Sequence, residues 1–421
     1  MKTADVQINQ VSQGWKHVKL GDALEVIRGA SPRPKGDPRY FGGKIPWIMI
    51  ADVTREKGKY LSGTRQHVTE EGAKKSRYLK AGTLILSNSA TVCVPKILQV
   101  DGCIHDGFVA FPNLPQDIDI YYLYYFFEYI RPQIINENRQ GITQVNLNTT
   151  IVKNIDLILA PPYEQKRIVA EIEKQFSRMD EAVANLNRVK ANLKRYKAAV
   201  LKAAVEGKLT AVNGHASWKH QPIDVAIESL DQGWSPRCEN EPSNSPEVWG
   251  VIKTTAVQAL RFLEIENKRL PAKLKPRRHL ELSAGDLLIT RAGPRTRVGV
   301  ACLVKATRPR LINCDKVYRL RAKSDMAIPA YLELVLNAPH IVNELDELKT
   351  GISDSGLNLT QKRFRDLIIP FPPLAEQKRI VSEVERHLSI ISEVELEVDT
   401  NLNRAERMRQ SVLRNAFLGK S

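Results

Sequence analysis

A chain of 421 residues is too long for one hydrophobic core, so its length predicts two or more domains. Its composition, 43% hydrophobic and 26% charged residues, is typical of an ordinary soluble globular protein. The formal net charge of +16 indicates a polyanionic partner, and DNA is favoured over a membrane because the sequence contains neither a long apolar run nor a basic amphipathic anchor.

The first half of the chain opens on a polar segment that lacks the apolar core of a signal peptide, so we expect a cytoplasmic protein. Short runs rich in β-branched and aromatic residues follow, separated by Gly, Pro, Asn and Asp, as in strands joined by turns. We expect strands within 45–53, 83–87, 91–100 and 108–111, and a helix within 121–130. These elements predict a mixed α/β globule.

A long helix is predicted next, from Glu164 to Lys208. Prolines stand just before its start and Gly207 lies near its end, which is the usual placement of both residue types. The helix would be roughly 60 Å long. Apolar residues recur along it at every seventh position, namely Ile172, Met179, Leu186, Leu193 and Val200. Such a seam indicates pairing with a second helix.

The second half of the chain repeats this order. We expect strands within 287–290, 298–304 and 316–320, and a helix within 330–336. A second long helix, from Glu376 to Lys420, follows the first at a constant distance of 212 residues. Its apolar positions are Val384, Ile391, Val398, Ala405 and Val412. The sequence therefore predicts an internal repeat of two similar halves, each a globule followed by a long helix.

Shorter motifs extend the repeat into the globules, at offsets that drift because loops differ in length. The matched segments are Gly29-Ala-Ser31-Pro32 with Gly233-Trp-Ser235-Pro236, Ala81-Gly82 with Ala284-Gly285, Tyr122-Leu123 with Tyr331-Leu332, Gly141-Ile142 with Gly351-Ile352, and Leu147-Asn148 with Leu357-Asn358. The resulting fold class is mixed α/β (α+β), with globular domains at 1–160 and 213–371 and helical spacer regions at 161–212 and 372–421. The simplest pairing of the helices is an antiparallel coiled coil, with an approximate two-fold axis relating the halves.

Catalytic motifs receive no support from the sequence. Ala160-Pro-Pro-Tyr163 resembles the signature of amino-methyltransferases, but Ala160 has no side-chain oxygen to accept a hydrogen bond from the target amine. The Glu164-x-Lys166 spacing of metal-dependent nucleases falls in the first turn of a helix, whereas that chemistry needs carboxylates that converge from adjacent strands. The histidines lack ligand spacing and the five cysteines form no close pairs. We therefore predict no catalytic and no metal-binding residues.

Candidate DNA-binding residues lie in a loop between two strands and in its counterpart. The loop contains Arg291, Arg295 and Arg297, and the counterpart contains Ser87, Asn88 and Ser89. An arginine can bond guanine and an asparagine adenine, although a loop that only touches phosphates is nearly as well supported. A second pair of candidates precedes the two Gly-Ile steps: Arg139 with Gln140, and Lys349 with Thr350.

Three segments resemble the specificity subunit of type I restriction-modification systems. They are Pro-Pro-Tyr-Glu-Gln-Lys-Arg-Ile-Val at 161–169, Pro-Pro-Leu-Ala-Glu-Gln-Lys-Arg-Ile-Val at 372–381, and Ala-Val-Leu-Lys-Ala-Ala-Val-Glu-Gly-Lys-Leu at 199–209. The resemblance covers the whole chain and its internal repeat.

The resemblance implies a non-catalytic DNA reader used in phage defence, with two target-recognition domains that bind the halves of a split, asymmetric site. The paired helices would fix the gap between the half-sites and dock two adenine-N6 methyltransferase subunits, which use S-adenosylmethionine, and through them restriction subunits that use ATP and Mg. No cofactor is expected in this chain. Two other hypotheses stay open here, an autonomous sequence-specific regulator and a basic scaffold that binds DNA without sequence preference.

Overall fold

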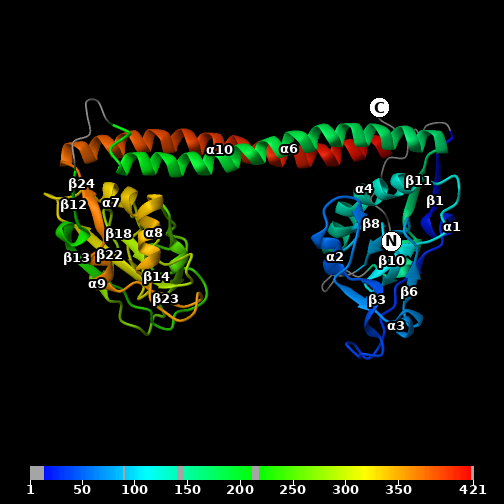
Figure 1. Cartoon of the computed structure of the whole chain (residues 1–421), viewed down its shortest axis with the longest axis horizontal. Coiled ribbons are helices and arrows are strands. Elements are labelled where there is room, and N and C mark those ends of the chain that lie inside the picture. Colours follow the sequence, from blue (N-terminus) through cyan, green and yellow to red (C-terminus); the bar gives the residue numbers. More distant parts are fainter. Residues whose placement is uncertain (1–13, 89–90, 140–146, 211–217, 419–421) are drawn as a thin grey trace. The chain divides into compact units, whose positions relative to one another are not determined.

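The structure is a computed structural model that describes residues 14–88, 91–139, 147–210 and 218–418 (Figure 1). The chain divides into two compact units. Unit 1 consists of Met1–Leu186 and Thr400–Ser421, and unit 2 consists of Asn187–Asp399. Unit 1 is therefore assembled from two separate pieces of the chain, whereas unit 2 is continuous.

In the described part of unit 1 the strands form three sheets. They are β1 (Lys16–Lys19) with β11 (Asp156–Leu159); β2 (Ile27–Arg28), β10 (Phe108–Phe111), β7 (Leu84–Ser87), β8 (Pro95–Leu98) and β4 (Tyr60–Leu61) in that order; and β5 (Gln66–Val68), β3 (Phe41–Ile48), β9 (Gly102–Ile104) and β6 (Arg77–Leu79). The shorter helices are α1 (Leu20–Ala23), α2 (Ile50–Arg55), α3 (Glu70–Lys74), α4 (Ile120–Arg139) and α5 (Thr149–Lys153). Strands β7, β8 and β10 are buried at every residue, including the polar Ser87 of β7 and Lys96 of β8.

The described part of unit 2 repeats this plan. Its strands are β12 (Lys219–Pro222) with β24 (Ile368–Phe371); β13 (Ile227–Gln232), β22 (Val317–Ala322), β18 (Leu287–Thr290) and β20 (Ala301–Leu303) in that order; β17 (Asn267–Arg269), β14 (Gly250–Ile252) and β21 (Leu311–Ile312); β15 (Val257–Gln258) with β16 (Arg261–Phe262); and β19 (Ala292–Gly293) with β23 (Leu357–Asn358). The helices are α7 (Pro329–Leu336), α8 (Pro339–Glu347) and α9 (Gln361–Arg365), with 3₁₀ turns at Ile223–Ala226, Thr254–Ala256 and Arg278–Leu280. The mixed α/β fold class predicted from the sequence is confirmed.

Two long helices, α6 (Pro162–Val205) and α10 (Leu374–Phe417), confirm the predicted helical repeat. Helix α6 ends three residues before the expected end because Gly207 adopts a left-handed conformation with φ of +73°. The Lys208 N–H then donates to the Ala203 carbonyl at 2.8 Å, which closes the last turn. Both helices have 44 residues, and the offset of 212 holds at both of their ends.

Within each unit the two long helices pack side by side in opposite directions (Figure 1). In unit 1, Arg409 of α10 forms an ion pair with Asp180 of α6. In unit 2, Lys190 of α6 lies 2.7 Å from the Asp399 carboxylate, and the Tyr196 hydroxyl lies 2.8 Å from a ring nitrogen of His387. Residue numbers rise along one helix as they fall along the other. The predicted antiparallel pairing is therefore present in each unit.

The ten residues of the predicted heptad seam are buried or half-buried. Fully buried are Ile172, Val200, Val384, Ile391 and Val398, while Met179, Leu186, Leu193, Ala405 and Val412 are half-buried. The seam residues near the helix ends also join the globule cores. Ile172 belongs to the unit 1 core, and Val200 and Val384 belong to the unit 2 core. Each helix pair is thus continuous with the hydrophobic core of its unit.

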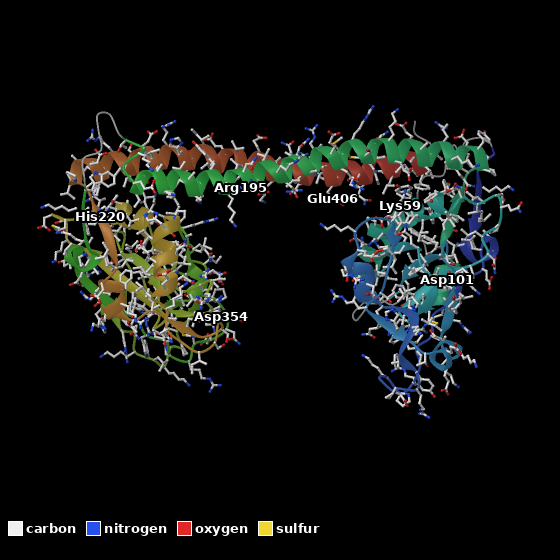
Figure 2. All side chains as sticks on the ribbon, in the orientation of Figure 1. Lys59, Asp101, Arg195, His220, Asp354 and Glu406 are labelled. Atoms are coloured by element: carbon white, nitrogen blue, oxygen red, sulfur yellow. The ribbon has the colours of Figure 1, made fainter. Side chains whose placement is uncertain are left out.

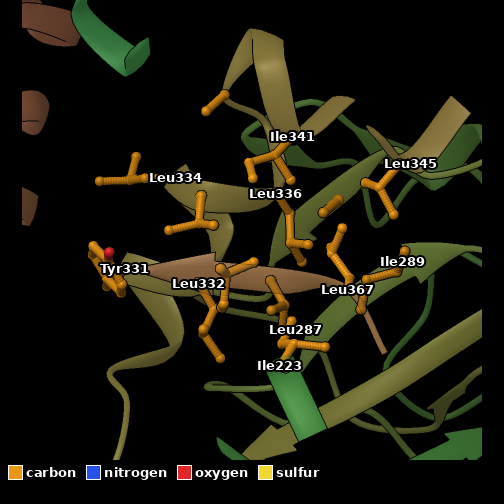
Figure 3. Packing of buried hydrophobic residues seen from close by; sticks show 14 of the residues in the cluster. Ile223, Leu287, Ile289, Tyr331, Leu332, Leu334, Leu336, Ile341, Leu345 and Leu367 are labelled. Atoms are coloured by element: carbon orange, nitrogen blue, oxygen red, sulfur yellow. The ribbon is translucent and has the colours of Figure 1, made fainter. Parts of the chain in front are cut away.

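The main core of unit 2 lies between the β13-β22-β18-β20 sheet and helices α7 and α8 (Figure 3). Leu287 and Ile289 of β18 face Leu332 and Leu336 of α7 within this cluster, and all four are fully buried. Tyr331 is also fully buried, and its hydroxyl donates to the Pro370 carbonyl at 2.9 Å. Unit 1 has the equivalent bond, from the Tyr122 hydroxyl to the Ile158 carbonyl at 2.7 Å, which confirms the match of Tyr122 with Tyr331.

One sequence match is wrong. Asn148 caps α5 by accepting a hydrogen bond from the Ile151 N–H, and Thr360 caps α9 in the same way. Leu147-Asn148 therefore corresponds to Leu359-Thr360 and not to Leu357-Asn358. The offset of 212 seen in the helices thus reaches back to Leu147. The sequence misled because Leu-Asn occurs at both 357–358 and 147–148, while a threonine performs the same capping role.

The strand predicted over 45–53 is also partly wrong, because α2 begins at Ile50. The Asp52 carboxylate is 2% exposed and accepts a hydrogen bond from the Met49 N–H at 3.0 Å, which caps the start of this helix. Arg55 binds the same carboxylate at 3.0 Å. Side-chain hydrogen bonds at one turn therefore override the strand-like run of Ile and Met.

Candidate nucleic-acid interface

A serine-aspartate pair recurs at equivalent positions of the two units. In unit 1, Ser31 donates to the Asp106 carboxylate at 2.9 Å. In unit 2, Ser235 donates to the Asp315 carboxylate. In both units the aspartate N–H donates back to the serine hydroxyl, at 3.3 and 3.2 Å. The two segments therefore form the same turn against the same strand connection.

The glycine of the Gly-x-Ser-Pro motif explains why the motif is repeated. A Cβ atom on Gly29 would lie 2.1 Å from the His105 carbonyl oxygen, and one on Gly233 would lie 2.3 Å from that of Asn313. Only glycine allows this close approach of two backbones. The motif thus fixes the loop after β2 or β13 against the loop before β10 or β22.

Asn88 and Arg291 also occupy equivalent positions, directly after β7 and β18. The Asn88 amide donates to the Asp106 carbonyl at 3.3 Å, and the Arg291 guanidinium donates to the Asp315 carbonyl at 3.1 Å. Their own carbonyls accept the N–H groups of Leu147 and Leu359, at 2.9 and 2.8 Å. The sequence analysis matched these two loops, and the structure shows that the two side chains bond to equivalent backbone carbonyls.

Ser87 and Asn88 are buried and shape their loop. Ser87 is fully buried; its hydroxyl accepts from the Val94 N–H at 2.9 Å and donates to the Thr91 carbonyl. In unit 2, Thr290 accepts the Val300 N–H at 3.0 Å and donates to the Arg297 carbonyl. Ser89 lies outside the described residues.

Arg297 ties its loop to the rest of unit 2. Its guanidinium donates to the Val257 carbonyl at 2.8 Å, to the Thr254 carbonyl and to the Gln258 side-chain oxygen at 3.2 Å. Arg291 lies over the Tyr318 ring, 5.5 Å from its centroid. These two arginines are half-buried and already bind groups of their own domain.

The structure brings Arg295 and Lys349 together. Thr350, the next residue after Lys349, pairs with Asn358. Arg295 binds Asp354 at 2.9 Å and Asp346 at 2.6 Å, and these hydrogen bonds raise its pKa. The Lys349 ammonium binds Asp346 at 2.6 Å and the Arg295 carbonyl at 2.8 Å, and its bond lowers the pKa of Asp346. In unit 1, Arg139 is the last residue of α4, and Gln140 lies outside the described residues.

Other exposed cations near these turns were not singled out from the sequence. Arg33 has a 71% exposed side chain and lies 3.7 Å from the Asp106 carboxylate, and Arg28 donates to the Asp106 carbonyl at 3.3 Å. In unit 2, Arg277 lies 4.5 Å from the centroid of the Trp234 ring. Lys273, Lys275 and Arg278 beside it are also exposed. The Gly-x-Ser-Pro repeat, which precedes Arg33 and contains Trp234, was the sequence signal that could have located them.

Both units therefore present hydrogen-bonding loops bordered by exposed arginine and lysine side chains, which suit a phosphate backbone and the edges of bases. Burial lowers the pKa of His105, so that its imidazole is neutral near pH 7 and adds no charge to this edge. Among the residues that the structure describes, no group of three or more His, Cys, Asp or Glu side chains could hold a metal ion. No helix in the described ranges is long and apolar enough to cross a membrane.

Comparison with known proteins identifies the family. Residues 12–194 and 297–400, well over half of the chain, match the family described as type I restriction modification DNA specificity domain. The specificity subunit of the Escherichia coli type I restriction enzyme EcoEI is 38% identical over 200 residues, which are 47% of this chain and 34% of that protein. The EcoKI specificity subunit of E. coli strain K12 is 24% identical over 98% of this chain and 90% of its own length. The StySPI subunit of Salmonella potsdam is 28% identical over the same shares.

Solved structures agree in fold. A chain from a study of complex assembly and conformational transition of the type I R-M system superposes with a TM-score of 0.73 at 16% identity, over 98% of this chain and 100% of that one. The crystal structure of the HsdS subunit from Thermoanaerobacter tengcongensis gives a TM-score of 0.52 at 17% identity, over 98% and 99% of the two chains. With its repeated Gly-x-Ser-Pro turns and paired helices, this chain belongs to the DNA specificity subunits of type I restriction-modification systems, which recognise DNA and carry out no catalysis themselves.

Proposed function

We propose that this chain selects a split, asymmetric DNA site and directs adenine-N6 methylation and restriction to it through partner subunits. One observation carries the proposal. The two units present the same turn and loop framework, yet the exposed cations that border it differ. They are Arg28 and Arg33 in unit 1, and Lys273, Lys275, Arg277 and Arg278 in unit 2. Two domains that share a fold but present different surfaces fit a DNA site whose two halves differ in sequence.

We propose that residues 1–160 and 213–371 are the two target-recognition domains, and that 161–212 and 372–421 are the spacer regions. The partners would be double-stranded DNA, two methyltransferase subunits that use S-adenosylmethionine, and restriction subunits that use ATP and Mg, all in the cytoplasm. The candidate DNA-contacting residues remain those predicted from the sequence, in the loops after β7 and β18 and before the two Gly-Ile steps.

The alternative, an autonomous DNA-binding regulator, receives no support from the comparisons, since the relatives are named as subunits of restriction enzymes.

The decisive experiment is a genome-wide map of N6-methyladenine in the source cells, with and without this gene. Loss of one split motif on deletion is expected, and it would give both half-sites and their gap. An unchanged map would contradict the proposal.

A change in helix length is expected to change the gap between the half-sites. Adding one heptad of seven residues after Asn185 and another after Glu397 lengthens both helices by roughly 10 Å. Because one base pair rises by about 3.4 Å, we expect the methylated motif to gain about three base pairs in its gap. The measurement is the methylation map of cells that carry the altered gene.

The control adds three residues at each of the same two positions. This insertion breaks the heptad register, so it should reduce methylation without producing a longer-gap motif. If the seven-residue variant methylates the original motif with its original gap, the helices do not set the spacing.

A further inference from the structure

Ile352 has a fully exposed side chain, at 109% of the reference area. It lies in the loop that joins α8 to β23, in the segment 350–358 of unit 2. Isolated exposed apolar residues are common on proteins, so exposure alone says little. The loop that carries Ile352, however, has a fixed conformation.

The base of this loop is closed by backbone pairing. Thr350 and Asn358 exchange both of their N–H···O hydrogen bonds, each at 2.8 Å, and β23 continues the pairing with β19. Gly351 has a φ of +144°, and a Cβ atom there would lie 2.9 Å from the Gly356 carbonyl oxygen. The residue directly before Ile352 must therefore be glycine. The loop has a specified conformation, and Ile352 lies beyond its closed base.

The tip of the loop is fastened to the neighbouring β18–β20 connection by Arg295. The Arg295 N–H donates to the Asp354 carbonyl at 2.8 Å, and its guanidinium binds the Asp354 carboxylate at 2.9 Å. The same guanidinium binds Asp346 of α8 at 2.6 Å. Figure 2 shows Asp354 on the part of the unit 2 globule turned away from the long helices. One arginine thus links the loop tip, the helix before it and the β18–β20 connection.

A loop fastened at its base and tip holds the exposed Ile352 side chain in one place on unit 2. The β18–β20 connection beside it carries Arg291 and belongs to the edge proposed above to face DNA. A Gly-Ile pair also occurs in the corresponding segment of the first half, at 141–142, outside the described residues. Proteins that read DNA use apolar side chains against thymine methyl groups and against base steps.

We propose that Ile352 is a base-contacting residue of unit 2 and that Arg295 and Asp354 position it. This inference rests on the proposed function, since it needs unit 2 to bind one half-site. It assigns Arg295 a role other than direct hydrogen bonding to guanine. Its guanidinium is occupied by two carboxylates, and its contribution to recognition is the placement of the neighbouring loop.

The test uses the full chain assembled with its methyltransferase partner and two duplexes of equal length, one with the mapped site and one with the second half-site scrambled. Affinities are measured by fluorescence anisotropy at one fixed salt concentration, because salt alone changes them greatly. Ile352→Ala is expected to weaken binding to the true site by about tenfold and to leave binding to the scrambled duplex unchanged. Ile265→Ala removes an isoleucine of the same unit that is 62% exposed, and it should change neither affinity.

Asp354→Ala tests the positioning role. It frees the Arg295 guanidinium from one of its carboxylates, so direct reading of guanine by Arg295 would be unharmed or strengthened. Our inference expects the opposite, a loss of site preference like that of Ile352→Ala. Asp354→Asn, which keeps an oxygen that can accept from Arg295, should restore part of that preference.

The outcomes distinguish failure of the proposed function from failure of the role proposed for Ile352. If the unaltered complex binds both duplexes equally, the proposed function fails. If it prefers its site but Ile352→Ala retains that preference, or weakens binding to both duplexes equally, only the present inference is overturned. Loss of the methyltransferase partner from the Ile352→Ala complex, with DNA preference intact, would likewise overturn it and make Ile352 part of a protein interface.

Discussion

Replacement of Phe417 by alanine is expected to destabilise unit 1 by about 3–5 kcal/mol, the usual cost of removing a large aromatic side chain from a core. Phe417 is the last residue of α10, yet it is 1% exposed and lies in the core of the first globule. Its ring lies 5.0 Å from that of Tyr122 and 5.7 Å from that of Phe126, and it stacks on Tyr129 at 5.4 Å. Alanine would leave a cavity among these three aromatic residues of α4.

The effect should be confined to unit 1. Hydrogen exchange followed by mass spectrometry is the suitable measurement, because it reports the two units separately. Peptides of α4 and β10 should lose protection, and peptides of unit 2 should not. Met408→Ala, at a position of α10 that is 49% exposed, is the control and should change stability by less than about 0.5 kcal/mol. Equal loss of protection in both units would contradict the assignment of Phe417 to the unit 1 core.

Replacement of Gln165 by leucine is expected to cost about 3–5 kcal/mol, because it leaves several buried backbone groups without partners. The Gln165 side chain accepts from the Asp119 N–H at 2.8 Å and donates to the carbonyls of Asp117 and Ala160, at 2.9 and 2.8 Å. It is 1% exposed. One amide thus links the start of α6 to the segment that leads into α4.

Unit 2 repeats this amide contact bond for bond. Gln377 accepts the Ile328 N–H at 2.9 Å and donates to the carbonyls of Met326 and Pro372, at 3.0 and 2.9 Å. The repeated Glu-Gln-Lys segment therefore contains a structural glutamine in each half. Gln377→Leu should destabilise unit 2 as Gln165→Leu destabilises unit 1.

Chemical denaturation of each variant measures these losses. Gln175→Leu on the same helix is the matched control, since the Gln175 amide donates to Glu171 at the surface, at 2.8 Å. Its loss should stay below about 0.5 kcal/mol. A stability change of Gln165→Leu no larger than that of Gln175→Leu would show that the buried amide contributes little.

The sequence predicted the long helices and their pairing well because both follow from local information. A seven-residue period marks one face of a helix, and the constant offset of 212 residues marks the repeat. Glycine motifs also succeeded: the match of Gly29 with Gly233 is supported by the same close backbone approach in both units. Where a motif fixes the backbone conformation by itself, comparison of the two halves of the sequence was enough to identify equivalent positions.

The roles of polar side chains could not be predicted, because their partners lie far away in the chain. Arg295 binds carboxylates 51 and 59 residues away, and Gln165 bonds to backbone groups 46 and 48 residues before it. From the sequence alone, a loop with three arginines is expected to form a basic surface. In the fold Arg297 binds carbonyl groups of its own domain and Arg295 binds two aspartates. Only tertiary contacts separate a structural arginine from one free to bind DNA.

The division of unit 1 into two pieces of chain has a consequence for synthesis on the ribosome. Translation delivers residues 1–186 first and then the whole of unit 2, and only afterwards the segment from Thr400 that contains Phe417. At one stage of translation, therefore, all residues of unit 2 have been made but the end of α10 has not. At that stage the aromatic side chains of α4 that pack against Phe417 lack this partner. The unit that emerges first is the last to be completed, and its exposed apolar surface needs protection from aggregation for as long as unit 2 is being made.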